Sequence, residues 1–145
     1  MSAPTIVDVQ GRKLKLTNLE KTLYPAAEFT KGQVVDFYVR IAPVLVPHLA
    51  GRALTMKRYP EGVDHEYFFE KNAPMHRPDW VKTAPVWSES NHRTIHFILA
   101  NDLATVVWIA NALWYVIVLR CREQGLFSVA FTARCRHRRF RAIFL

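Results

Sequence analysis

The chain of 145 residues is poor in cysteine, and its two cysteines, Cys121 and Cys135, do not form a CxxC pair. This argues against a zinc knuckle, and two such cysteines do not indicate a disulfide framework. The N-terminus also lacks the basic start and the apolar run of a secretion signal. Because half of the residues are hydrophobic and the length suffices for a core, we expect one globular domain. The scarcity of cysteine indicates an intracellular protein.

Long hydrophobic runs are scarce as well. The one exception is residues 103–119, which are 17 residues without a charge, at the lower limit of about 17–25 residues for a membrane-spanning helix. Thr105 and Asn111 interrupt this run, and Asp102 and Arg120 flank it. We interpret its first half as a buried helix. A membrane-associated product is the alternative that this run and a basic tail would support.

Lysine is absent after Lys82, although the net charge of +8 and the pI near 9.9 favour a polyanionic partner such as nucleic acid. Residues 120–145 hold seven arginines and a single acidic residue, Glu123. This tail could be a basic arm that binds phosphates, but its many apolar residues favour the product of a shifted reading frame. We therefore predict a domain over residues 1–111 and an aberrant hydrophobic and arginine-rich tail over residues 112–145.

The body of the chain contains patterns typical of both strands and helices. Thr30 and Gln33 have the spacing of a capping box, which predicts a helix from there to about His48, with a break or kink at Pro43 and Pro47. A second helix should begin at Asn101 or Asp102 and end near Asn111. Strands are predicted on either side of a turn at Gln10-Gly11, and over residues 53–59, 67–69, 81–87 and 94–99. The expected fold class is α+β.

Four stretches carry a family resemblance: LTNLEKTLYP (16–25), FTKGQVVDFYVRIAP (29–43), GRALTMKRYPEGVDHEYFFEKN (51–72) and LATVVWIAN (103–111). In this order they resemble the polymerase (primase-type) domain of bacterial DNA ligase D, in the archaeo-eukaryotic primase superfamily. The resemblance covers about residues 7–111. It implies the N-terminal part of a primase-polymerase fold, incomplete in this chain.

The resemblance implies a pocket for the 5′-phosphate of a broken DNA end, formed by Asn18, Lys21 and Lys31. Physical chemistry is consistent with that assignment. Lys31 lies in the first turn of a predicted helix, where unpaired N–H groups and the positive end of the helix dipole favour an anion. A terminal phosphate carries nearly two negative charges, which two lysines can balance.

The resemblance also assigns Lys57 to nucleotide binding, and Arg58, Phe68 and Phe69 to contact with the template DNA. Because neighbouring strand residues point to opposite faces, we expect Lys57 and Arg58 to diverge and one of the two phenylalanines to lie in the core. The polar turn at residues 88–93 corresponds to a surface loop that helps to pair two DNA ends, although it could equally be an ordinary turn.

Metal ligands are what the chain lacks most conspicuously for this family. The family holds Mn²⁺ or Mg²⁺ with an Asp-x-Asp pair and a later aspartate, and no two of the five aspartates here are separated by one residue. Where the family has a stretch like A-L-E-x-H-V-P, residues 112–120 read ALWYVIVLR. We therefore assign no catalytic and no metal-binding residue, and expect the chain alone to be inactive.

These observations predict a truncated primase-polymerase of non-homologous end joining that retains the 5′-phosphate pocket and lacks the catalytic carboxylates. A stand-alone, non-catalytic module that binds DNA ends is the alternative. The implied partners are DNA ends with a 5′-phosphate, nucleoside triphosphates in the intact family, Ku and a ligase domain, with no membrane. The expected location is the bacterial cytoplasm, associated with the nucleoid.

Overall fold

The computed structural model describes residues 4–61, 64–113, 115–120 and 126–127. These residues form two helices, ten strands and two short 3₁₀ turns, η1 (Pro25–Ala27) and η2 (Glu89–Asn91). The helices are α1 (Lys31–Leu49) and α2 (Leu103–Leu113). The strands are β1 (Thr5–Val9), β2 (Arg12–Leu16), β3 (Thr22–Tyr24), β4 (Phe29–Thr30), β5 (Leu54–Arg58), β6 (Phe68–Glu70), β7 (Thr83–Ser88), β8 (Arg93–Ile98), β9 (Tyr115–Arg120) and β10 (Leu126–Phe127).

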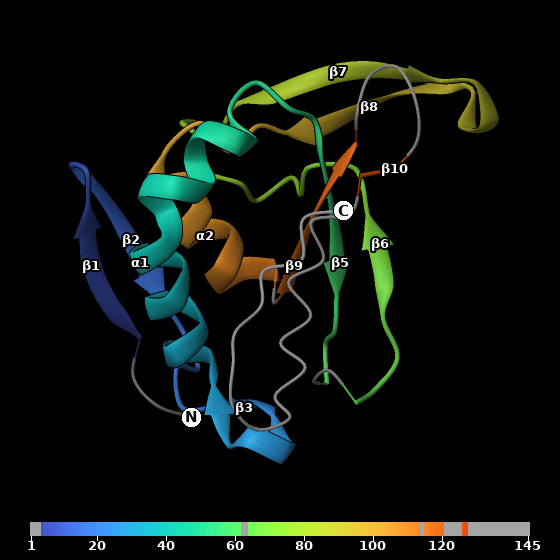
Figure 1. Cartoon of the computed structure of the whole chain (residues 1–145). Helices are drawn as coiled ribbons and strands as arrows, with labels where there is room; N and C mark the ends of the chain where they lie inside the picture. Colours follow the sequence, from blue (N-terminus) through green and yellow to red (C-terminus); the bar gives the residue numbers. More distant parts are fainter. Residues whose placement is uncertain (1–3, 62–63, 114, 121–125, 128–145) are drawn as a thin grey trace.

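The main sheet is built around β5. One edge of β5 pairs with β9 along its whole length, and the other edge is shared between β8, at Leu54, and β6, from Met56 to Arg58. The strand order is β10-β9-β5-β8-β7, and every pairing among the described strands is antiparallel. Figure 1 shows both helices on one side of β5 and the β1–β2 hairpin beyond them. The expected α+β class is confirmed.

The predicted turn at Gln10-Gly11 joins β1 and β2. Both residues have positive φ, 54° and 75°, as the tightest hairpin turns require. The Asp8 carboxylate accepts a hydrogen bond from the Gly11 amide at 2.9 Å, which closes the turn. The short β3–β4 hairpin was not predicted, because Thr22–Tyr24 and Phe29–Thr30 are too short to show a periodic pattern.

Helix α1 begins with the predicted capping box. The Thr30 hydroxyl accepts from the Gln33 amide at 3.4 Å, and the Gln33 side chain accepts from the Thr30 amide at 2.7 Å. The predicted break at Pro43 and Pro47 is wrong, because the helix runs without interruption to Leu49, and a kink at these prolines stays a prediction. Both prolines lie on the exposed face, four residues apart, while the opposite face is packed into the core. Tertiary packing therefore compensates for the lost helical hydrogen bonds.

Helix α2 is apolar on every side, and its residues 104–110 are all buried. Such a helix is stable only where other elements cover it, and α1 and β2 both contact α2. The uncharged run 103–119 divides between α2 and β9, which confirms the prediction of a buried helix in its first half. Among the described helices, none is long and apolar enough to cross a membrane.

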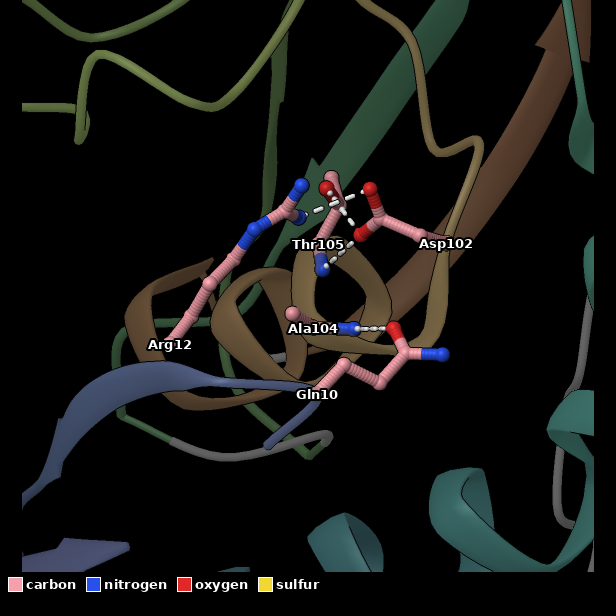
Figure 2. A network of polar contacts seen from close by, with 5 residues as sticks. All are labelled: Gln10, Arg12, Asp102, Ala104 and Thr105. Carbon is pink, nitrogen blue, oxygen red and sulfur yellow. Dashed lines mark hydrogen bonds and ion pairs between the residues drawn. The ribbon is translucent and has the colours of Figure 1, made fainter. Parts of the chain in front are cut away.

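A polar network fastens the β1–β2 hairpin to the start of α2 (Figure 2). Asp102 caps the helix by accepting from the amide and the hydroxyl of Thr105, both at 2.8 Å. Arg12 donates to the same carboxylate at 2.7 Å, and the Gln10 side chain accepts from the Ala104 amide at 3.4 Å. Burial raises the pKa of Asp102, but these hydrogen bonds outweigh it, so the pKa lies below its ordinary value.

Candidate nucleic-acid interface

A tight turn over residues 18–21 presents two of the predicted phosphate ligands. Asn18 has a φ of +52°, a left-handed conformation that asparagine adopts more readily than most residues. The Lys21 amide donates to the Asn18 carbonyl at 3.1 Å, which brings the two residues onto one turn. The Asn18 side chain is exposed and the Lys21 side chain is partly buried.

Two backbone amides in the first turn of α1 form hydrogen bonds to this segment. The Lys31 amide donates to the Lys21 carbonyl at 2.9 Å, and the Gly32 amide donates to the Leu19 carbonyl at 2.8 Å. A Cβ atom on Gly32 would lie 3.3 Å from that carbonyl, so glycine permits the close approach. The third amide of the helix, that of Gln33, donates to the Thr30 hydroxyl in the capping box. The expectation of unpaired N–H groups here is therefore wrong, and only the helix dipole favours an anion.

Lys31 lies behind the turn and is 1% exposed. Its ammonium group donates to the Thr17 carbonyl at 2.5 Å and is 3.5 Å from the Thr17 hydroxyl. Burial, and then the charge of Lys21, lower the pKa of Lys31 to about 8. The structure thus brings Asn18, Lys21 and Lys31 together, with two cations close enough to repel each other.

A contact from Lys21 joins this turn to the main sheet. The Lys21 ammonium donates to the carbonyl of Pro60 at 3.1 Å, two residues beyond β5. On β5 itself, the Lys57 ammonium lies 3.6 Å from the centre of the Tyr67 ring and 5.0 Å from that of Tyr59. Phe69 pairs with Lys57 across the strands, and its ring is 5.8 Å from Tyr67. Lys57 is thus lined by aromatic rings, which attract a cation.

The opposite face of the same two strands carries Arg58. Its guanidinium forms an ion pair with Glu70 at 3.4 Å and lies 5.7 Å from the Phe68 ring, so Lys57 and Arg58 diverge as predicted. The prediction that one phenylalanine lies in the core is wrong, because Phe68 is 47% exposed and Phe69 is 53% exposed. Strand β6 has three residues and pairs only with β5 among the described strands, too little cover to bury either ring.

The β7–β8 hairpin extends along the top of Figure 1, and its tip projects beyond the neighbouring strands. The tip comprises η2 and His92, which has a φ of +46°. Asn91 donates to the Ser88 hydroxyl at 2.9 Å and stabilises the turn. Trp87, next to the tip, is 55% exposed. A role of residues 88–93 in pairing DNA ends stays a prediction.

The donor groups of the described residues do not fit a two-metal centre. No three histidine, cysteine, aspartate or glutamate side chains gather there in a way that could hold a metal ion. His92 and His96 lie at the tip end and along β8, respectively. We therefore derive no catalytic step through Mn²⁺ or Mg²⁺ for these residues.

Several residues at this surface were not identified from the sequence. The rings of Tyr59 and Tyr67 lie beside the Lys57 ammonium. Tyr59 is two residues after Lys57 and Tyr67 is two residues before Phe69, a spacing that places residues on the same face of a strand and could have revealed them. The Pro60 carbonyl, which anchors Lys21, carries no side-chain signal at all. Asn111 contacts the segment that leads into the turn, from 94 residues away in sequence, and no local pattern could have shown that.

Comparison with known proteins gives a consistent result. Residues 30–121 match the family described as "LigD, primase-polymerase domain". The chain is 42% identical over 99 residues to the multifunctional non-homologous end joining protein LigD of Mycolicibacterium smegmatis, covering 68% of this chain and 13% of that protein. It is 33% identical over 101 residues to the bifunctional LigD of Bacillus subtilis, covering 70% of this chain and 16% of that protein.

The fold is similar to a solved structure, the polymerase domain of Mycobacterium tuberculosis ligase D in complex with DNA. The TM-score is 0.69 at 32% sequence identity, covering 78% of this chain and 41% of that one. The chain therefore spans less than half of that solved polymerase domain, and about one-seventh of the length of the curated relatives it matches.

Proposed function

Because the chain belongs to the LigD primase-polymerase family of bacterial non-homologous end joining, we propose that it binds broken DNA ends through their 5′-phosphate. Asn18 and Lys21 contact the phosphate, and Lys31 adds positive charge from behind the turn. The solved relative was obtained in complex with DNA, which is consistent with a nucleic-acid partner.

The observation that carries this proposal is the pair of neighbouring cations at the turn. The charge of Lys21 helps to lower the pKa of buried Lys31, so the two ammonium groups repel each other in the free protein. A terminal phosphate with nearly two negative charges would relieve that repulsion and raise the pKa of Lys31. The anion thus gains more from this pair than from two isolated surface lysines.

Contacts between the turn and the main sheet support the assignment of the other predicted residues. Lys21 contacts Pro60, two residues beyond β5, and Lys57 on β5 lies beside the Tyr67 ring. Half-exposed Phe68 and Phe69 offer ring faces on which unpaired template bases can stack, and Arg58 adds a cation beside Phe68. We propose that template DNA contacts these rings, which lie on opposite faces of the β5–β6 pair, and that Lys57 contacts the nucleotide in the longer proteins of the family.

The chain is proposed not to extend a primer by itself. Its sequence contains no Asp-x-Asp pair, and the described residues form no cluster that could hold a metal ion. A stand-alone module that only binds DNA ends would have the same surface. Nucleoside triphosphates, Ku and a ligase domain are proposed partners only of the longer family proteins.

The phosphate pocket can be tested with duplex DNA that carries a recessed 5′-phosphate or a 5′-hydroxyl. We expect the phosphate to improve binding about tenfold, as a charge-assisted hydrogen bond would. Asn18→Ala and Lys21→Ala should each remove most of this preference. Lys13→Ala is the matched control, because Lys13 is an exposed lysine on β2 and its loss changes the net charge equally. Equal affinity of the unmodified chain for both ends would refute the proposal.

Primer extension with Mn²⁺ and ribonucleotides tests the catalytic part separately. We expect no template-dependent product above a metal-free control. Extension would mean that residues of this chain assemble a metal site that the sequence does not reveal.

A further inference from the structure

Asn111 lies near the end of α2 and makes two hydrogen bonds to β2 and the residue after it. Its side-chain NH₂ group donates to the Lys15 carbonyl at 3.0 Å, and its side-chain oxygen accepts from the Thr17 amide at 3.1 Å. A single amide group thus contacts the backbone of residues 15 and 17 in the way a neighbouring strand would. These bonds hold the chain at the point where β2 ends and the turn over residues 18–21 begins. We call this turn, which carries the proposed phosphate site, the phosphate turn.

Thr17 connects Asn111 with the proposed pocket. Its amide is held by Asn111, and its carbonyl accepts the hydrogen bond from the Lys31 ammonium at 2.5 Å. Asn18, the first residue of the turn, follows directly with its left-handed φ of +52°. A shift of Thr17 would therefore move both the acceptor of Lys31 and the exposed Asn18 side chain.

We propose that Asn111 is a positioning residue for the 5′-phosphate site, acting through Thr17 on Lys31 and Asn18. The proposal rests on the proposed function and goes beyond it, because it makes the end of the buried helix α2 part of the recognition site. Asn111 does not contact the DNA itself.

The chemistry of the side chain agrees with this role. Asparagine is a poor residue within a helix, and α2 is otherwise almost wholly apolar. An uncharged side-chain amide can donate to one backbone group and accept from another through the same planar group. An alanine would leave the Lys15 carbonyl and the Thr17 amide without these partners.

Asn101 offers a matched control at the other end of α2. Its side-chain oxygen accepts from the Gly51 amide at 2.8 Å, so it is the same residue type with the same kind of backbone bond. Gly51 follows the cap of α1, at the opposite end of that helix from Lys31 and the phosphate turn. Asn101→Ala should therefore leave the phosphate preference unchanged.

The experiment compares Asn111→Ala and Asn101→Ala in the whole chain. It measures affinity for 5′-phosphate and 5′-hydroxyl duplexes between pH 6.5 and pH 9.5, together with thermal unfolding, in buffers of about physiological salt. We expect the roughly tenfold phosphate preference to fall to less than about twofold in Asn111→Ala only. The midpoint of the pH dependence of phosphate binding should also shift, because the environment of Lys31 changes.

The outcomes separate this inference from the proposed function. If the unmodified chain shows no phosphate preference, both fail. If it shows the preference and Asn111→Ala keeps the same ratio and the same pH midpoint, only the positioning role is overturned. Asn111→Gln, which carries the same amide on a longer side chain, should fold and lose part of the preference. Loss of cooperative unfolding in both Asn111 variants would show that Asn111 serves the fold instead, which also overturns the inference.

Discussion

Helix α2 and the β5–β6 strands of this protein differ in how much of their side chains is exposed. Residues 104–110 of α2 are at most 6% exposed, whereas Phe68 and Phe69 on β6 are about half exposed. On α2, apolar side chains pack against one another. On the β5–β6 surface, the rings instead lie beside cations, with Lys57 next to Tyr67 and Arg58 next to Phe68.

Stability and the proposed recognition of DNA depend on different parts of this fold. Burial of apolar area provides stability without any particular polar partner, and it occurs on α2 and the buried face of α1. Recognition needs exposed rings and charges, which contribute little to stability. Polar side chains at the two ends of α2, Asp102 and Asn111, attach the β1–β2 hairpin and the segment that leads into the turn over residues 18–21 to the buried helix.

The largest effect should come from removing β9. Residues 112–145 are proposed as a tail, but β9 covers one whole edge of β5 and the family match extends to residue 121, so we favour a boundary near residue 120. A chain of residues 1–111 should lose cooperative thermal unfolding, because the edge of β5 loses five paired residues. A chain of residues 1–120 should keep it. Equal cooperativity of both would support the boundary at residue 111.

Breaking the polar network at the start of α2 should have the next largest effect. Asp102→Ala removes the helix cap and the carboxylate partner of Arg12, which should cost about 2–3 kcal/mol in the free energy of unfolding. Asn101→Ala, which removes one exposed hydrogen bond, should cost about 1 kcal/mol or less. Urea unfolding of both variants measures the difference. Losses of equal size would mean that the network in Figure 2 adds little.

Truncating the exposed rings should weaken binding and spare the fold. Phe68→Ala and Phe69→Ala should each weaken binding to DNA with a single-stranded template overhang by about 1–3 kcal/mol, the usual contribution of one stacked base. Because both rings are half exposed, each variant should lose about 1 kcal/mol or less in unfolding free energy. A blunt duplex is the control substrate. A large loss of stability with unchanged DNA binding would make these rings part of the core.

A change of pH should have the smallest effect on DNA binding, and it acts in opposite directions on stability and binding. The pKa of Lys31 is about 8 in the folded chain, below its ordinary value of 10.5, so the unfolded chain holds more protons between these values. Its contribution to stability should therefore rise as pH increases from about 8 to about 10.5.

Binding of the 5′-phosphate should show the reverse trend, because it needs the charged form of Lys31. We expect about a threefold to tenfold loss of affinity between pH 7 and pH 9 for phosphorylated ends. Ends with a hydroxyl group should change much less. Parallel curves for the two kinds of ends would show that Lys31 does not act on the phosphate.

Local signals in the sequence predicted the elements that carry their own pattern. The capping box at Thr30, the turn at Gln10-Gly11 and the start of α2 at Asp102 all lie where short-range chemistry indicates. Predictions failed where distant residues decide the outcome. Helix α1 continues through its two prolines because its opposite face is packed into the core. Both phenylalanines of β6 are exposed because few other residues pack against that strand.

The family, the capping box of α1 and the opposite faces of Lys57 and Arg58 could be predicted from the residues alone, since these depend on motifs and on the period of a strand. Packing between distant segments sets the contact of Lys21 with Pro60, the pairing of the amides at the start of α1 and the contact of Asn111 with Thr17. The physical reason is that these contacts join segments 10 to 94 residues apart, so their geometry follows from packing rather than from any local pattern.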